Sequence, residues 1–112
     1  MQENTPVSQH VTEVKSLKNL LQYQDGAVVS RVLLKNPCGT VTLFAFANGE
    51  GLSEHTAAFD ALVIGINGQA EIQISGQKYR LHEEETITMP ANQPHAIKAE
   101  SNFKMLLVMI KA

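Results

Sequence analysis

Residues 67–82 read Asn-Gly-Gln-Ala-Glu-Ile-Gln-Ile-Ser-Gly-Gln-Lys-Tyr-Arg-Leu-His, and this stretch decides the fold class. Residues 70–74 and 78–82 each alternate apolar with polar side chains, as a strand with one buried face does. Asn67-Gly68 before the first segment is the strongest short signal for a hairpin turn, and Ser75-Gly76 separates the two segments. The stretch therefore predicts antiparallel β-structure.

Outward from this hairpin, the chain continues as short β-branched or apolar segments separated by turn residues. These segments are residues 27–35, 40–47, 59–66, 86–89, 95–99 and 104–110. About eight short strands at roughly 8–12-residue spacing indicate a sandwich or barrel. The last segment, 104–110, is apolar on both faces, so we expect it at the centre of a sheet or against a second subunit.

The N-terminal part of the chain differs from the rest. Residues 1–12 are polar and aperiodic, whereas Val14, Leu17, Leu20 and Leu21 have helical spacing. We therefore expect a tail with a short helix over residues 1–26, and a single β-barrel domain over residues 27–112.

Composition and charge narrow the class of protein. The 112 residues amount to one domain, with 44% hydrophobic and 18% charged residues. A formal net charge of −2, without a basic stripe, argues against a nucleic-acid partner. The single cysteine, Cys38, cannot form an internal disulfide. The sequence has neither an apolar signal segment nor a run of about 20 apolar residues, so we expect a cytoplasmic protein without membrane contact.

Two histidines are the main candidates for functional residues in this sequence. The segment 86–89 runs into Pro90 and Pro94, which end strand pairing, and His95 opens the next strand. His55 follows a glycine-rich loop further upstream. An all-β fold that brings these two imidazoles together predicts a small pocket, and Phe44, Phe46 and Phe59 are candidates to line it.

At this point the sequence resembles the cupin family over residues 28–110. Gly49, His55 and Gly68 fit the spacing of the first cupin motif, with Ala57 and Ala61 where that motif has its second histidine and its glutamate. Pro90 and His95 fit the second motif, in which Glu84, Asn92 and Ala99 replace two glycines and an asparagine. The resemblance implies an all-β, double-stranded β-helix (jelly-roll) barrel, here with a short N-terminal helical turn.

The same resemblance implies a metal position. In metal-binding cupins, both histidines and the glutamate of the first motif bind one ion together with the histidine of the second motif. This chain keeps two of those four ligands, His55 and His95. They are the candidate ligands for one divalent transition metal (Zn, Ni, Fe, Mn or Cu), since neutral imidazole suits all of these.

Asp60 is the candidate catalytic acid or base. In a regular strand its side chain points away from the face that carries residues 55, 57, 59 and 61, but a β-bulge near Thr56 would turn it inward. A second register places Ser53 and His55 at the two histidine positions and Asp60 at the acid position. Inside an apolar barrel the pKa of Asp60 would rise, as a general base requires.

These residues support three hypotheses about function. The first is a binding module in which His55 and His95 orient a small apolar or aromatic molecule. The second, implied by the resemblance, is a metal-dependent dioxygenase, isomerase or decarboxylase. The third is association through a dimer surface alone. The apolar last strand and the resemblance both predict a homodimer, and the number of ligating side chains in the barrel discriminates between enzyme and binding module.

Overall fold

The computed structural model describes residues 12–112, so residues 1–11 of the predicted tail lie outside the described residues. The described part contains one 3₁₀ turn, η2 (Leu17–Asn19), and nine strands. The strands are β1 (Val28–Asn36), β2 (Gly39–Phe46), β3 (Gly51–His55), β4 (Phe59–Asn67), β5 (Gln69–Ile74), β6 (Gln77–His82), β7 (Thr86–Met89), β8 (His95–Ala99) and β9 (Phe103–Lys111).

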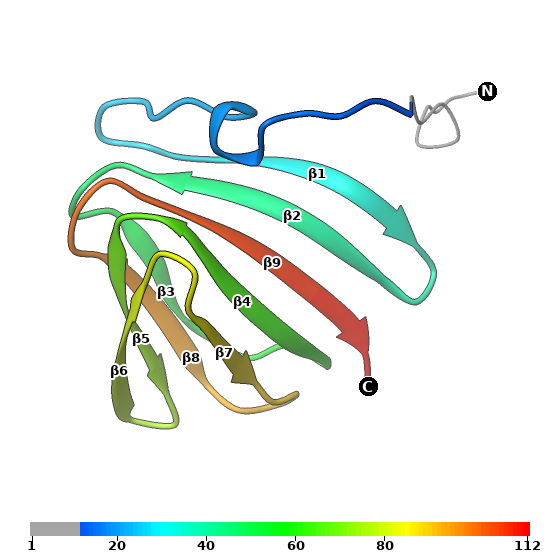
Figure 1. Ribbon diagram of the computed structural model, residues 1–112. Coiled ribbons are helices and arrows are strands. Elements are labelled where there is room, and N and C mark those ends of the chain that lie inside the picture. Colours follow the sequence, from blue (N-terminus) through cyan, green and yellow to red (C-terminus); the bar gives the residue numbers. More distant parts are fainter. Residues whose placement is uncertain (1–11) are drawn as a thin grey trace.

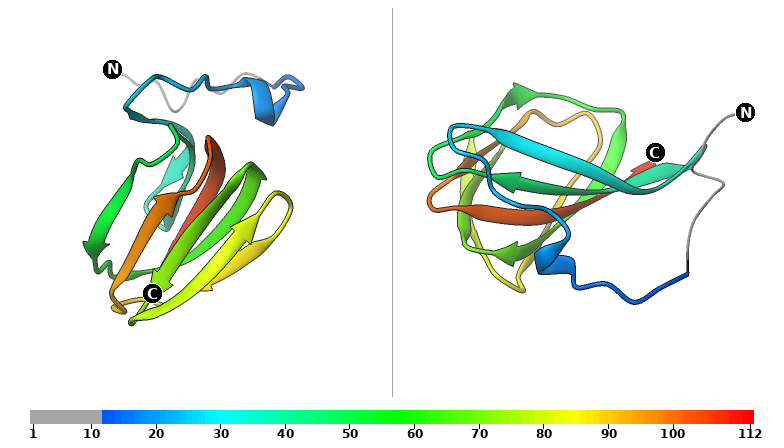
Figure 2. Two further views of the ribbon diagram at one scale, coloured as in Figure 1. Left: turned by 90° about the vertical axis from the view of Figure 1, so that its left-hand side faces the viewer. Right: turned by 90° about the horizontal axis from the view of Figure 1, so that it is seen from above.

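The strands form two antiparallel sheets that pack face to face (Figure 1). The five-stranded sheet has the order β1-β2-β9-β4-β7, and the four-stranded sheet has the order β3-β8-β5-β6. Figure 2 shows the long strands β1, β2 and β9 side by side along one wall of the molecule. The predicted all-β jelly-roll barrel with a short N-terminal helical turn is therefore confirmed. β9 lies between β2 and β4, so the expected central position in a sheet is confirmed.

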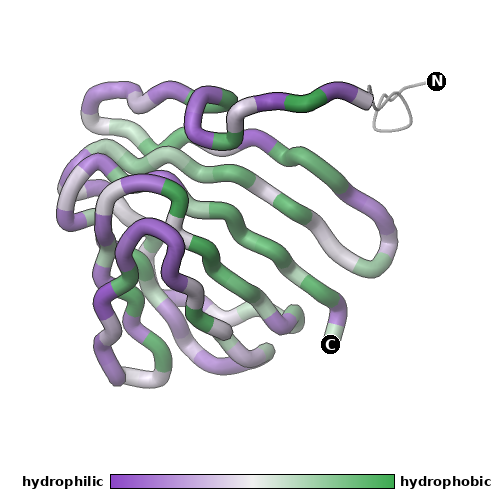
Figure 3. The backbone as a smooth tube through the Cα atoms, in the orientation of Figure 1, coloured by the Kyte–Doolittle hydropathy of each residue, from purple (hydrophilic) through white to green (hydrophobic). Residues whose placement is uncertain are grey.

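The core lies between the two sheets, where every second side chain of a strand points inward. It is formed by Phe46, Ala61, Val63, Ala70, Ile72, Ile74, Leu81, Met89, Ile97, Ala99, Phe103 and Met105. On β5, Ile72 and Ile74 are buried in it as predicted, and the strands that carry the core appear as apolar bands in Figure 3. Asn67-Gly68 forms the predicted turn between β4 and β5, and Gly68 adopts a φ of 77°, which glycine tolerates best.

The N-terminal segment covers part of the opposite, outer face of the five-stranded sheet. The predicted short helix is a single 3₁₀ turn, η2, without a buried residue. Behind it, the Lys104 ammonium of β9 donates to the carbonyl of Lys18 and lies 4.8 Å from the centre of the Tyr23 ring. The Tyr23 hydroxyl accepts a hydrogen bond of 2.7 Å from Asn67. No helix in residues 12–112 has the length and apolar character needed to cross a membrane.

Candidate functional site

The two predicted site histidines lie opposite each other in the four-stranded sheet. His55 ends β3 and His95 begins β8, and the two residues are paired across these strands. Their ring centroids are 4.3 Å apart with an interplanar angle of 66°, which is an edge-to-face contact. His95 is buried, with 7% of its surface exposed, whereas His55 is exposed. The pair therefore has one ring inside the barrel and one at its rim.

Each imidazole is held by a carbonyl two residues earlier in the chain. His55 Nδ1 lies 2.7 Å from the Ser53 carbonyl oxygen, and His95 Nδ1 lies 3.1 Å from the Gln93 carbonyl oxygen. A carbonyl oxygen can only accept, so Nδ1 carries the proton in the neutral form of each ring. Both Nε2 atoms then keep a lone pair with which to accept a hydrogen bond or bind a metal.

The turn before His95 is fixed by three hydrogen bonds to other parts of the fold. Asn92, with a φ of 67°, donates its backbone N–H to the Ala57 carbonyl at 2.7 Å. The Ala91 N–H donates to the Asp60 carboxylate at 2.9 Å, and Ser75 donates to the Pro94 carbonyl at 2.8 Å. The turn thereby positions the Gln93 carbonyl that orients His95.

Asp60 lies on the outer face of β4. It is exposed, while its neighbour Ala61 is buried in the core, so the strand is regular at this point. The irregularity in this part of the fold falls between Leu52 and His55 rather than near Thr56, and it leaves Asp60 outside. A role as general base in the barrel stays a prediction that this position does not favour. The contact seen in the structure is the hydrogen bond that Asp60 accepts from Ala91.

The three phenylalanines differ in how far a ligand can reach them. Phe44 is half-buried against the core and stacks on Phe46, with ring centroids 5.8 Å apart. Phe46 is fully buried and also contacts Phe103, with centroids 5.9 Å apart. Phe59 is half-buried at the start of β4, two residues before the buried Ala61. Phe44 and Phe59 thus remain partly accessible, whereas Phe46 is fully buried and stacks against Phe44.

His55 and His95 are the two predicted metal ligands that the structure brings together. Within residues 12–112, no three side chains of the types His, Cys, Asp and Glu come close enough to share an ion. Protein metal sites with an open position usually have three protein ligands. The donor set therefore does not fit the ion that the family's metal-binding members hold, and Ala57 and Ala61 occupy the positions where the missing ligands would be.

Comparisons with known proteins agree with this architecture. A family profile described as a cupin domain matches residues 42–111. A conserved protein of unknown function from Streptococcus pyogenes is 34% identical, with 92% of this chain and 90% of that chain covered and a TM-score of 0.87. A cupin superfamily protein from Desulfitobacterium hafniense is 32% identical, with 86% and 88% covered and a TM-score of 0.83. A cupin 2 conserved barrel domain protein from Leptotrichia buccalis is 38% identical, with 84% of this chain and 46% of that chain covered and a TM-score of 0.82. No curated protein matches the chain.

Proposed function

Because this chain belongs to the cupin family, we propose that its barrel binds a small apolar or aromatic molecule that His55 and His95 orient. The observation that carries the proposal is the arrangement of the two imidazoles. Their centroids are 4.3 Å apart, and each Nδ1 is engaged by a backbone carbonyl. Two Nε2 lone pairs close together form a site for a ligand with a hydroxyl or N–H group.

The inner faces of β2 and β4 favour an apolar ligand body. Phe44 and Phe59 are half-buried, and the core behind them consists of apolar side chains. Ala57 and Ala61 put methyl groups where larger polar side chains would otherwise stand. Ligand sites in proteins are mostly apolar with a few polar groups that fix orientation, and this combination has that character.

A pair of matched probes tests the proposal. Phenol carries a hydroxyl that can donate to Nε2, and anisole has the same ring without a donor. We expect phenol to bind more tightly, and His55→Ala to weaken phenol binding about fivefold, the equivalent of one neutral hydrogen bond of about 1 kcal/mol. Anisole binding should change little in the same variant. His82→Ala is the control, because His82 is an exposed histidine on the outer face of β6.

His95 needs a substitution that keeps its buried volume. His95→Phe retains a ring at this position but removes both nitrogens, so folding can be checked separately from binding. Equal affinities for phenol and anisole, or phenol binding that both histidine variants leave unchanged, would contradict the proposal.

Elemental analysis of protein purified without chelator separates this proposal from the metal-dependent enzyme. Stoichiometric Mn, Fe, Co, Ni, Cu or Zn that disappears in His55→Ala would favour the enzyme. Metal in substoichiometric amounts that does not depend on His55 leaves the binding proposal standing.

A further inference from the structure

A cleft opens at the side of the barrel, between β6 and β7. These strands are the edge strands of the two sheets, and the loop from residue 83 to 85 joins them. The cleft has a volume of about 620 Å³ and is lined by Tyr79, Arg80, Leu81, Glu84, Glu85, Thr86 and Ile87. Sites for small molecules in proteins measure roughly 300–1,000 Å³, so the cleft is large enough for a compact ligand.

The floor of the cleft is apolar and aromatic. Leu81 belongs to the core, and Ile87 is half-buried against it. Tyr79 pairs with the fully buried Ile72 across β5 and β6, so its ring lies on the inner face of the sheet. It is nevertheless 44% exposed, because β6 has no neighbour on its other side. The Tyr79 ring, which lies on the inner face of its sheet, thus borders the opening between the edge strands β6 and β7.

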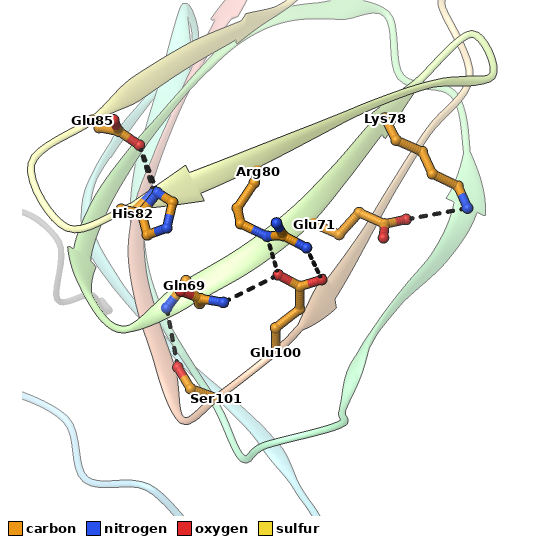
Figure 4. A network of polar contacts seen from close by, with 8 residues as sticks. All are labelled: Gln69, Glu71, Lys78, Arg80, His82, Glu85, Glu100 and Ser101. Atoms are coloured by element: carbon orange, nitrogen blue, oxygen red, sulfur yellow. Dashed lines mark hydrogen bonds and ion pairs between the residues drawn. The ribbon is translucent and has the colours of Figure 1, made fainter.

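The free charge at the rim of this cleft is negative. The Arg80 guanidinium is engaged by both carboxylate oxygens of Glu100, at 2.7 and 3.1 Å (Figure 4). Glu85 Oε1 accepts from the backbone N–H of His82 at 2.8 Å and lies 3.1 Å from the His82 ring Nδ1, and the Glu85 side chain is 57% exposed. Glu84 forms no ion pair within residues 12–112. The cationic lining residue is therefore neutralised, while the Glu84 carboxylate and the second carboxylate oxygen of Glu85 remain to face a ligand.

The loop that carries these carboxylates is held in one conformation. Glu84 has a φ of 71° and donates its N–H to the Gly65 carbonyl at 2.8 Å, and Gly65 donates to the Glu85 carbonyl at 2.8 Å. A Cβ at position 65 would overlap the carbonyl oxygen of His82, so this approach requires glycine. The rim of the cleft is thus positioned by backbone contacts rather than left free.

We propose that the cleft between β6 and β7 binds a small organic cation with an aromatic or aliphatic body. The apolar body would lie on Tyr79, Leu81 and Ile87, and its ammonium group would face Glu84 and Glu85. The ring face of Tyr79 also attracts a cation. A peptide strand added to the edge of β6 is the less favoured occupant, because the long charged side chains of Lys78 and Arg80 lie along that edge and oppose strand addition.

The test is an NMR titration of the full chain with three probes that share one ring. Benzylammonium carries a positive charge, benzyl alcohol none, and benzoate a negative charge. We expect saturable amide shifts at Tyr79, Leu81 and Ile87 with benzylammonium, weaker binding of benzyl alcohol and none of benzoate. Glu84→Gln and Tyr79→Leu should each raise the benzylammonium Kd about two- to fivefold. Glu13→Gln, which changes an exposed glutamate of the N-terminal segment, should not.

This inference would be overturned by equal affinities for the three probes, by a benzylammonium Kd unchanged in both variants, or by shifts confined to His55 and His95. The last result would place the cation in the barrel instead. Amide shifts along β6 with an extended peptide, but none with benzylammonium, would also reject it. Each variant is first compared with the wild type by its amide spectrum, so that loss of folding is not taken for loss of binding.

Discussion

Replacing Gly65 by alanine should destabilise the protein through the loop between β6 and β7. The new Cβ would overlap the carbonyl oxygen of His82, which is backbone and cannot rotate away. The loop must then move, and the two 2.8 Å hydrogen bonds that tie Gly65 to Glu84 and Glu85 are strained or lost. At roughly 0.5–1.5 kcal/mol each, these bonds give a loss of about 1–3 kcal/mol in the free energy of unfolding.

Thermal unfolding followed by circular dichroism measures this loss. For a domain of this size, we expect the Tm to fall by roughly 4–12 °C. Gly76→Asn is the matched control, because a Cβ at Gly76 would meet no atom within 4 Å and asparagine tolerates its φ of 85°. Its Tm should fall less. Hydrogen exchange at the amides of Gly65 and Glu84 should accelerate in Gly65→Ala alone. A Gly65→Ala protein with the wild-type Tm and wild-type exchange at these amides would refute the reasoning.

Three further predictions concern other parts of the fold. The Arg80 guanidinium holds the pKa of Glu100 below its ordinary value of 4.5, so the pair stabilises the fold at neutral pH and this contribution disappears as the pH falls below about 4.5. Arg80→Gln should therefore flatten the acid side of the curve of Tm against pH, and an unchanged curve would contradict this. Burial lowers the pKa of the Lys104 ammonium, and Lys104→Met should keep the barrel folded while amide exchange in residues 17–23 accelerates, which equal exchange would disprove. The homodimer remains a proposal, with the outer face of β9 as its surface. Ile110→Glu changes a residue that is 59% exposed and should delay elution on size exclusion without loss of folding, whereas Leu107→Glu, on the inner face, should prevent folding. Unchanged elution of the Ile110 variant would reject this surface.

The strands could be predicted because their periodicity is a local property of the sequence. On β5 the alternation correctly separated the buried residues from the half-buried residues of the outer face, since a two-residue period follows from the backbone alone. β3 was not predicted, because Leu52 is its one large apolar residue and the strand lies at a sheet edge, largely exposed. The other edge strands, β1, β6 and β7, keep an apolar pattern and were predicted, so the missing pattern of β3 is what hid it.

Tyr79 shows where a correct prediction of side-chain direction was not enough. The alternation on β6 placed its ring on the inner face, and the pairing with Ile72 confirms this. The sequence gives no sign that β6 would be an edge strand facing β7, because strand order depends on pairings between residues far apart in the chain. The cleft that we propose as a cation site therefore results from the strand order, which no local sequence pattern predicts.

The candidate site was predictable in its members but not in its chemistry. The cupin spacing selected His55 and His95, and the structure pairs them across β3 and β8. The protonation of each ring depends instead on the carbonyls of Ser53 and Gln93, whose directions are set by the irregularity in β3 and by the turn at residues 90–94. These backbone features leave both Nε2 atoms available, while alanines stand at the two other ligand positions. Within residues 12–112, no third His, Cys, Asp or Glu side chain joins the pair. Two lone pairs are better matched to hydrogen bonding with a polar group on an apolar ligand than to holding an ion, and the phenol and metal measurements test this difference in donor number.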